Sequence, residues 1–246
     1  MQFSKEGETL VKRILNCIFM VAIVVALATG ANADTIHLSV GTAGTIPSRA
    51  TNEFISSGLF DGPKIGGYYG AQIYYHLPNI PVLTTLTFEF FGAEAGYNNE
   101  FNFYIWGELF DHSGGGTIIA PNLASPLDTF VLTTIGSGFG LLPFEFAINS
   151  RKAYLQNGFN PDDSGGASSG PNFFASFNPF GSTDGSGGTT GNIVYLFLDD
   201  GGAGPDDNHD DFLVRISIQA LPEPGILILL GISMMSVAGL RRWWRD

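Results

Sequence analysis

The chain has 246 residues, of which 23 are acidic, 11 are basic and one is cysteine. This length is enough for a domain with a sizeable hydrophobic core. The excess of negative charge argues against nucleic acid as a partner, because binding to nucleic acid requires a basic surface. It also disfavours anionic polysaccharide, unless a divalent cation bridges the two.

The N-terminal segment has the three parts of a secretory signal peptide. Two basic residues precede an apolar run at 14–28, and an Ala-Asn-Ala sequence follows. A charged region, an apolar region and an A-x-A site in this order are typical of such signals. We expect export through the Sec translocon and removal of residues 1–33 by signal peptidase, with Ala31 and Ala33 marking the cleavage site. The alternative is an uncleaved membrane anchor. The single cysteine lies inside the apolar run, so the mature chain would hold no disulfide.

Residues 34–221 read as one all-β domain. They contain nineteen acidic and five basic residues, so the acidity lies in the exported region. Alternating apolar and polar residues between Gly, Pro, Asn and Asp clusters predict about nine short strands, the pattern of a single β-sandwich or jelly-roll-like domain. We expect these strands at 36–40, 71–77, 85–90, 101–106, 130–134, 144–148, 173–177, 193–198 and 212–218. A short helix is expected within 51–59.

A turn at 92–100 supplies secondary candidates for a metal site. It joins two predicted strands and contains Glu94 and Asn98, whose side chains offer oxygen atoms. These two residues would join the acidic turn near the C-terminus only if both hairpins meet at the same end of the domain.

The densest group of acidic side chains lies at 199–211, between the last two predicted strands. Six aspartates fall within these thirteen residues, so folding would bring like charges together and a cation would neutralise them. The spacing does not complete an EF-hand, because Asp211 stands where that loop needs glycine. Two interpretations stay open, a calcium-binding loop and a solvated acidic hairpin that only supplies turn residues. The candidate calcium ligands are Asp199, Asp200, Asp206, Asn208 and Asp210.

Little in the sequence indicates catalysis. The four histidines are scattered without metal-ligand spacing, and we expect His209 to be an exposed neighbour of the acidic residues rather than a ligand. No G-x-S-x-G elbow is present, and the mature chain has no cysteine nucleophile. We therefore expect a protein that is not an enzyme.

The C-terminal segment, residues 222–246, combines three features in a fixed order. Pro222, Glu223 and Pro224 come first, an uncharged apolar run at 225–240 follows, and the basic tail 241–246 ends the chain. The run predicts a transmembrane helix, slightly short for a bilayer core of about 30 Å. Its arginines should stay cytoplasmic, which places the preceding domain outside the cell. These arginines are Arg241, Arg242 and Arg245.

This order resembles the PEP-CTERM sorting signal of exported proteins in exopolysaccharide-producing Gram-negative bacteria. The resemblance implies recognition by an exosortase-type processing enzyme that acts near the tripeptide. An ordinary tail anchor is the alternative. The turn at 92–100 and the strand at 212–216 also resemble segments of other PEP-CTERM surface proteins, which implies a shared β domain and no particular reaction.

These observations predict a non-catalytic β-sandwich protein of the cell surface or the extracellular biofilm matrix, with calcium as a candidate stabilising ion. The protein would be tethered to the inner membrane before processing. A carbohydrate-binding module acting on extracellular polysaccharide is the first alternative, and an extracellular glycan-acting hydrolase is the second.

Overall fold

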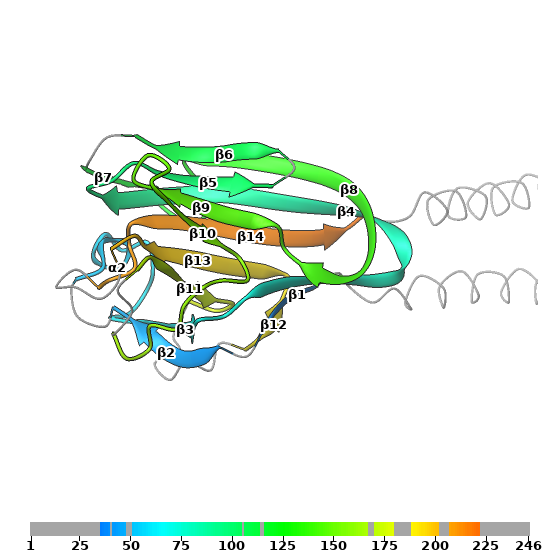
Figure 1. The fold of residues 1–246 in the computed structure, drawn as a ribbon, viewed down its shortest axis with the longest axis horizontal. Coiled ribbons are helices and arrows are strands. Elements are labelled where there is room, and N and C mark those ends of the chain that lie inside the picture. The colour runs from blue at the N-terminus through cyan, green and yellow to red at the C-terminus, as the bar shows by residue number, and fades with distance from the viewer. Residues whose placement is uncertain are drawn as a thin grey trace, which may run out of the picture. The chain divides into compact units, whose positions relative to one another are not determined.

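The longest strand, β4 (Ile73–Ala95), is the central element of the computed structural model shown in Figure 1. One edge of β4 pairs with β1 (Thr35–Leu38) and then with β14 (Phe212–Ala220). The other edge pairs with β8 (Asp128–Leu141) and then with β7 (Gly116–Ile119). The structure describes residues 35–39, 41–47, 51–104, 106–113, 116–166, 170–179, 188–201 and 207–221.

The described residues form two antiparallel sheets and one short helix. The larger sheet has ten strands, with the order β12-β1-β4-β14-β13-β11-β3-β2 and with β7 and β8 attached to β4. The smaller sheet has the order β10-β9-β5-β6. The remaining elements are β2 (Thr42–Ile46), α2 (Glu53–Ser56), β3 (Ile65–Tyr69), β5 (Asn99–Phe103), β6 (Gly107–His112), β9 (Phe144–Ile148), β10 (Ala153–Gln156), β11 (Asn172–Ser176), β12 (Thr190–Gly191) and β13 (Ile193–Asp199).

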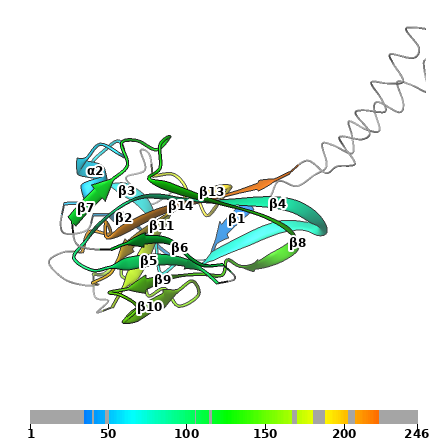
Figure 2. The ribbon, with the colours of Figure 1, turned by 90° about the horizontal axis from the view of Figure 1, so that it is seen from above.

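The larger sheet has other elements on both faces, with the smaller sheet along one face and α2 at one end of the other, as Figure 2 shows. On one face, aromatic rings of the two sheets meet in a shared core, for example Phe88 on β4 and Phe103 on β5 with ring centroids 5.0 Å apart. On the other face, Phe54 of α2 packs against Phe197 of β13 in a second core. Because β13 is buried on both sides, its sequence is apolar almost without interruption.

The fold class predicted from the sequence is confirmed in its coarse form, since the chain is mostly antiparallel β structure. Each predicted strand overlaps an observed one, and the predicted helix is present as the four residues of α2. The described residues contain fourteen strands rather than about nine. The missed strands are short, and several are rich in glycine or charge, so they lack the alternation that marks a half-buried strand.

Two separately predicted strands belong to the single strand β4. Pro78 and Pro81 separate them in the sequence, and proline usually interrupts a strand because it lacks an N–H donor. The pairing of β4 with β8 shifts register between Leu77 and Val82, which is where both prolines lie. The strand β4 therefore continues across both prolines, and the pairing with β8 is irregular at this point.

Residues Asp34–Ala220 form one compact unit. No helix in the described part of the chain is both long enough and apolar enough to cross a membrane. The predicted signal peptide with Ala31 and Ala33, the Pro222–Pro224 tripeptide, the apolar run at 225–240 and the basic tail lie outside the described residues.

Candidate functional site

The acidic connection between β13 and β14 is buried from Asp207 to Asp211, whereas Gly201 at its start is exposed. Asp207, His209 and Asp210 are at most 1 % exposed, and Asp199 at the end of β13 is fully buried. Residues 207–211 are therefore not a solvated hairpin. The expectation that His209 is exposed is wrong for the same reason.

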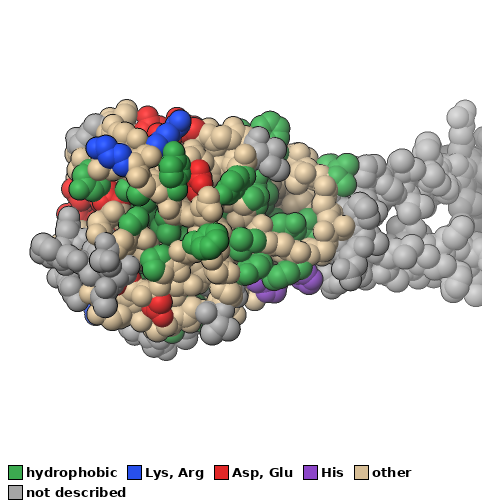
Figure 3. All heavy atoms as spheres, viewed as in Figure 1, with side chains coloured by type: hydrophobic (Ala, Val, Ile, Leu, Met, Phe, Trp, Pro, Cys, Tyr) green, Lys and Arg blue, Asp and Glu red, His purple; other side chains and the backbone are tan. Residues whose placement is uncertain are grey.

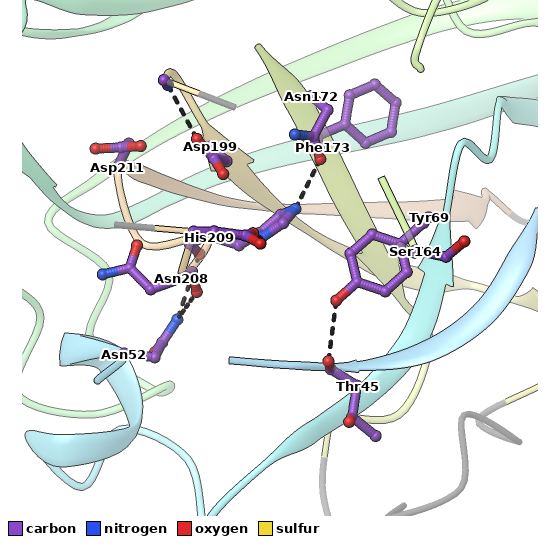
Figure 4. A network of polar contacts seen from close by, with 12 residues as sticks. Thr45, Asn52, Tyr69, Ser164, Asn172, Phe173, Asp199, Asn208, His209 and Asp211 are labelled. Atoms are coloured by element: carbon purple, nitrogen blue, oxygen red, sulfur yellow. Dashed lines mark hydrogen bonds and ion pairs between the residues drawn. The ribbon is translucent and has the colours of Figure 1, made fainter. Parts of the chain in front are cut away.

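The burial results from contacts with α2, which lies about 150 residues earlier in the chain. Asn52 caps this helix, since its Oδ1 accepts a hydrogen bond from the backbone N–H of Ile55 at 3.1 Å. Its Nδ2 donates to the carbonyl oxygen of Asn208 at 2.8 Å, a contact visible in Figure 4. Asn208 in turn donates through Nδ2 to the carbonyl oxygen of Thr51 at 3.1 Å. The acidic turn and the start of α2 thus hold each other in place.

Three carboxyl groups from separate segments converge beside this contact, and we call them the carboxylate cluster. Glu53 begins α2, Glu94 lies near the end of β4, and Asp210 precedes β14. One ligand oxygen from each lies within 4.8 Å of the other two. The backbone reinforces the arrangement, because the N–H of Glu94 donates to the carbonyl oxygen of Asp210 at 2.9 Å. The N–H of Glu53 donates to Asp210 Oδ2 at 2.8 Å.

The cluster holds buried oxygens without hydrogen-bond partners. These are Asp210 Oδ1 and Glu53 Oε2. Burial raises the pKa of Asp210, and the neighbouring carboxyl of Glu53 raises this pKa further. Such a group is neutralised either by a retained proton or by a bound cation. The described arginines Arg151 and Arg215 form their ion pairs away from this cluster, with Glu100 and Glu89 respectively.

A second group, the histidine cluster, lies around His209. It consists of His209, Asp199 and Asp207, which each offer one ligand atom within 4.8 Å of the other two. His209 Nε2 lies 2.7 Å from Oδ1 of Asn172 on β11. Its Nδ1 lies 3.7 Å from Asp207 Oδ1, beyond hydrogen-bonding distance. Burial lowers the pKa of His209 to about 3, so the imidazole is neutral.

Aromatic rings close the remaining sides of the histidine. The ring of Tyr69 on β3 meets His209 edge to face at a centroid distance of 5.4 Å, and that of Phe174 on β11 does so at 6.1 Å. Figure 4 shows the ring of His209 directed towards Asn172, with Asp199 on the same side of the histidine. The backbone of His209 has φ of 59°, a conformation uncommon for residues other than glycine. The imidazole is held by packing and by one hydrogen bond.

Three of the predicted ligands belong to these two groups. Asp210 and Glu94 belong to the carboxylate cluster, and Asp199 belongs to the histidine cluster. Asp200 instead accepts a hydrogen bond from Asn99 Nδ2 at 2.6 Å. Asn98 donates to Ser150 Oγ at 3.2 Å, Asn208 supports α2, and Asp206 lies outside the described residues.

Sequence reasoning missed three members of the two clusters. The sequence around Glu53 does not mark it as a ligand, because its partners lie far away in the chain and a carboxylate in the first turn of a helix is common. Asp207 and His209 were passed over within the acidic turn itself. His209 is the one histidine in a turn with six aspartates, and this combination of an imidazole with carboxylates is the sequence feature that could have indicated a metal site.

A separate groove of about 350 Å³ lies against β4 and β8, and its lining is mostly apolar. Trp106 lines it with a side chain that is 55 % exposed. The described residues around the groove include neither aspartate nor glutamate. Figure 3 shows further hydrophobic side chains on the surface of the molecule, and β8 contributes the exposed Val131, Ile135 and Phe139.

Comparison of the chain with protein-family models, with curated proteins and with solved structures finds no match.

Proposed function

We propose that this protein is an exported, non-catalytic β-sandwich whose fold is stabilised by a calcium ion at the carboxylate cluster. The observation that carries the proposal is the convergence of Glu53, Glu94 and Asp210 from three distant segments. A bound cation would neutralise these carboxylates, because the burial of Asp210 and the repulsion between neighbouring carboxylates both disfavour the ionised form without one.

Calcium fits the chemistry of these ligands. It binds six to eight oxygen atoms at about 2.3–2.6 Å, so two ligands on opposite sides of the ion are about 4.6–5.2 Å apart. The three carboxyl oxygens lie within 4.8 Å of one another, close enough for all of them to bind one ion. Water and neighbouring oxygen atoms would complete the coordination shell.

A calcium ion at this place would have a structural effect. It would join the start of α2, the end of β4 and the turn before β14, which are held by few other covalent or ionic constraints in a chain without mature disulfides. An ion bound only by the folded state stabilises that state in proportion to the logarithm of its concentration. The acidic surface would then serve display and solubility rather than catalysis.

The test is a set of thermal melts of the full-length protein in EGTA and in millimolar calcium. At a calcium concentration of about 100 times Kd, the gain is about 2.7 kcal/mol, or a rise in Tm of about 5–10 °C. The variant Asp210→Asn should lose this rise, whereas Asp111→Asn, which changes an exposed aspartate, should keep it. Equal melting curves in EGTA and calcium, or a full rise in Asp210→Asn, would overturn the calcium proposal.

We further propose that the C-terminal signal directs the protein to the cell surface or extracellular matrix. Strand β14 ends at Ala220, so the domain finishes two residues before Pro222. Replacing Pro222, Glu223 and Pro224 by alanine should leave full-length protein in the inner-membrane fraction of a strain with an exosortase-type enzyme. Equal processing of the wild type and the variant would show that the tripeptide is not needed.

Carbohydrate binding is the second candidate, and Trp106 favours it. An exposed tryptophan beside a groove can stack on a sugar ring, and the exposed Tyr104 lies two residues away. A glycan array with the full-length protein and with Trp106→Ala tests this function. Binding that the variant loses would support it, and the absence of any bound glycan would remove it.

A further inference from the structure

His209 has an unusual environment for a histidine in a protein core. Its side chain is fully buried between strands β3 and β11, and one ring nitrogen has a clear partner while the other has none. Buried polar atoms are nearly always hydrogen-bonded, so an exception calls for a physical explanation.

The hydrogen bond to Asn172 determines which nitrogen carries the proton. Asn172 Oδ1 can only accept, so His209 Nε2 donates to it at 2.7 Å. In a neutral imidazole the other nitrogen, Nδ1, then presents a lone pair. Asp207 Oδ1 lies 3.7 Å from this nitrogen.

This arrangement places a nitrogen lone pair and two carboxylates around one point. Asp199 and Asp207 provide the oxygen atoms, and all three ligand atoms lie within 4.8 Å of one another. A lone pair and a carboxylate repel each other, whereas a cation between them binds both. A histidine whose distal N–H is held by an amide oxygen is also the usual geometry of a metal ligand, because that contact fixes the ring and its tautomer.

We propose that His209 Nδ1, Asp199 and Asp207 bind a divalent transition-metal ion of the Zn²⁺ class, with Asn172 as the residue that orients the imidazole. One nitrogen and two carboxylate oxygens suit zinc, and a fourth ligand such as water would complete a tetrahedral site. This site is distinct from the carboxylate cluster. Adjacent residues serve the two, since His209 contacts Asn172 while Asp210 contacts Glu53.

The proposal does not depend on calcium binding, and the first experiment keeps the two sites separate. Full-length protein is stripped of metal, saturated with calcium and titrated with Zn²⁺ by calorimetry. One equivalent should bind to the wild type and to Asp210→Asn. His209→Gln should weaken the affinity at least about tenfold, because it removes a ligand. Co²⁺ should give the absorption bands of a four-coordinate site in the wild type and not in His209→Gln.

His76→Gln is the matched control. His76 is exposed, and its ring centroid lies 5.4 Å from that of His37, so this surface pair is another place where histidines could hold zinc. His76→Gln should keep the zinc affinity of the wild type. Loss of binding in this variant with retention in His209→Gln would overturn the proposal, as would the absence of stoichiometric binding to the wild type.

Two further measurements apply if His209→Gln fails to fold. Asn172→Asp keeps an acceptor for Nε2–H and should retain zinc, whereas Asn172→Leu should weaken zinc binding about 10–100-fold. In the wild type, nitrogen-15 spectra should show the Nε2–H tautomer of His209, and the Nδ1 signal should move when zinc is added. An Nδ1–H tautomer, or an Nδ1 signal that zinc leaves unchanged, would contradict the proposal.

Discussion

Arg215 on β14 and Glu89 on β4 lie directly opposite each other and form a two-point ion pair. Arg215 Nε lies 2.6 Å from Glu89 Oε2, and its Nη2 lies 2.7 Å from Glu89 Oε1. Both side chains are less than one fifth exposed. The guanidinium carbon of Arg215 also lies 4.8 Å from the ring centre of Phe91, so this aromatic ring covers one face of the guanidinium.

Removing one partner of this pair should destabilise the domain strongly. Glu89 raises the pKa of Arg215, so the guanidinium stays charged at every accessible pH. We expect Arg215→Met to lower the free energy of unfolding by about 3 kcal/mol, because Glu89 is left partly buried without its cation. Denaturant unfolding measures this change.

The double variant Arg215→Met with Glu89→Gln separates the pair from its surroundings. It should recover part of the loss, since no unpaired charge remains. The exposed pair of Arg151 with Glu108 serves as the control, and Glu108→Gln should cost less than about 1 kcal/mol. Equal losses from Arg215→Met and Glu108→Gln would show that burial of the Arg215 pair is unimportant.

The side chain of Asn157 connects the backbone at the start of β4 with the backbone just before β9. Its Oδ1 accepts from the N–H of Ile73 at 2.9 Å. Its Nδ2 donates to the carbonyl oxygens of Ile73 at 2.7 Å and Leu142 at 2.8 Å. We expect Asn157→Ala to cost about 3 kcal/mol, because it leaves buried backbone groups without partners. The surface variant Asn122→Ala should cost less than about 1 kcal/mol in the same denaturant titration.

Gly92 lies where β4 pairs with both β7 and β14, and its φ of 146° favours glycine. A Cβ at this position would lie 2.2 Å from the carbonyl oxygen of Ile118 on β7. Gly92→Ala should therefore lower the free energy of unfolding by about 1–3 kcal/mol and loosen β7. Gly96→Ala, where a Cβ meets no atom within 4 Å, should change stability little. Hydrogen exchange of the β7 amides would locate the effect.

The exposed apolar side chains of β8 should affect association rather than folding. Val131 and Ile135 are 57 % and 70 % exposed on a strand whose only described partner is β4. Replacing both by threonine should change the free energy of unfolding by less than about 0.5 kcal/mol. The same change should reduce self-association, because an apolar edge strand promotes pairing between molecules. Light scattering at increasing concentration measures this, and an unchanged result would show that β8 does not drive association.

Local patterns in the sequence identified the strands whose two faces differ or whose residues are continuously apolar. Phe212 to Ile218 alternates clearly, and it forms β14 as expected. The strand β3 has no clear alternation in the sequence, because Gly66 and Gly67 carry no side chain that could show a period. A Cβ at Gly67 would lie 2.3 Å from the carbonyl oxygen of Ala175, so the glycine reflects the close approach of β11. That requirement arises from the tertiary fold.

The candidate site was predictable only in part. The density of aspartates before β14 points to this turn, and of the two secondary candidates Glu94 lies beside Asp210 whereas Asn98 contacts Ser150. Burial of that turn was not predictable, because it depends on the contact of Asn52 with Asn208 across 156 residues. The same long-range contact brings in Glu53 and encloses His209. Spacing along the chain carries no information about such neighbours.

The position of β14 has a consequence for how the protein folds. This strand is the last one in the described chain, yet it lies between β4 and β13 in the interior of the larger sheet. Until it is added, β4 and β13 both present unpaired edges and apolar faces. Its pairing with β4 links residues more than a hundred positions apart, and such distant contacts form slowly. The core therefore cannot be completed until β14 has been synthesised. Before that point, the exposed apolar surface and the unpaired strand edges make the incomplete sheet prone to aggregation.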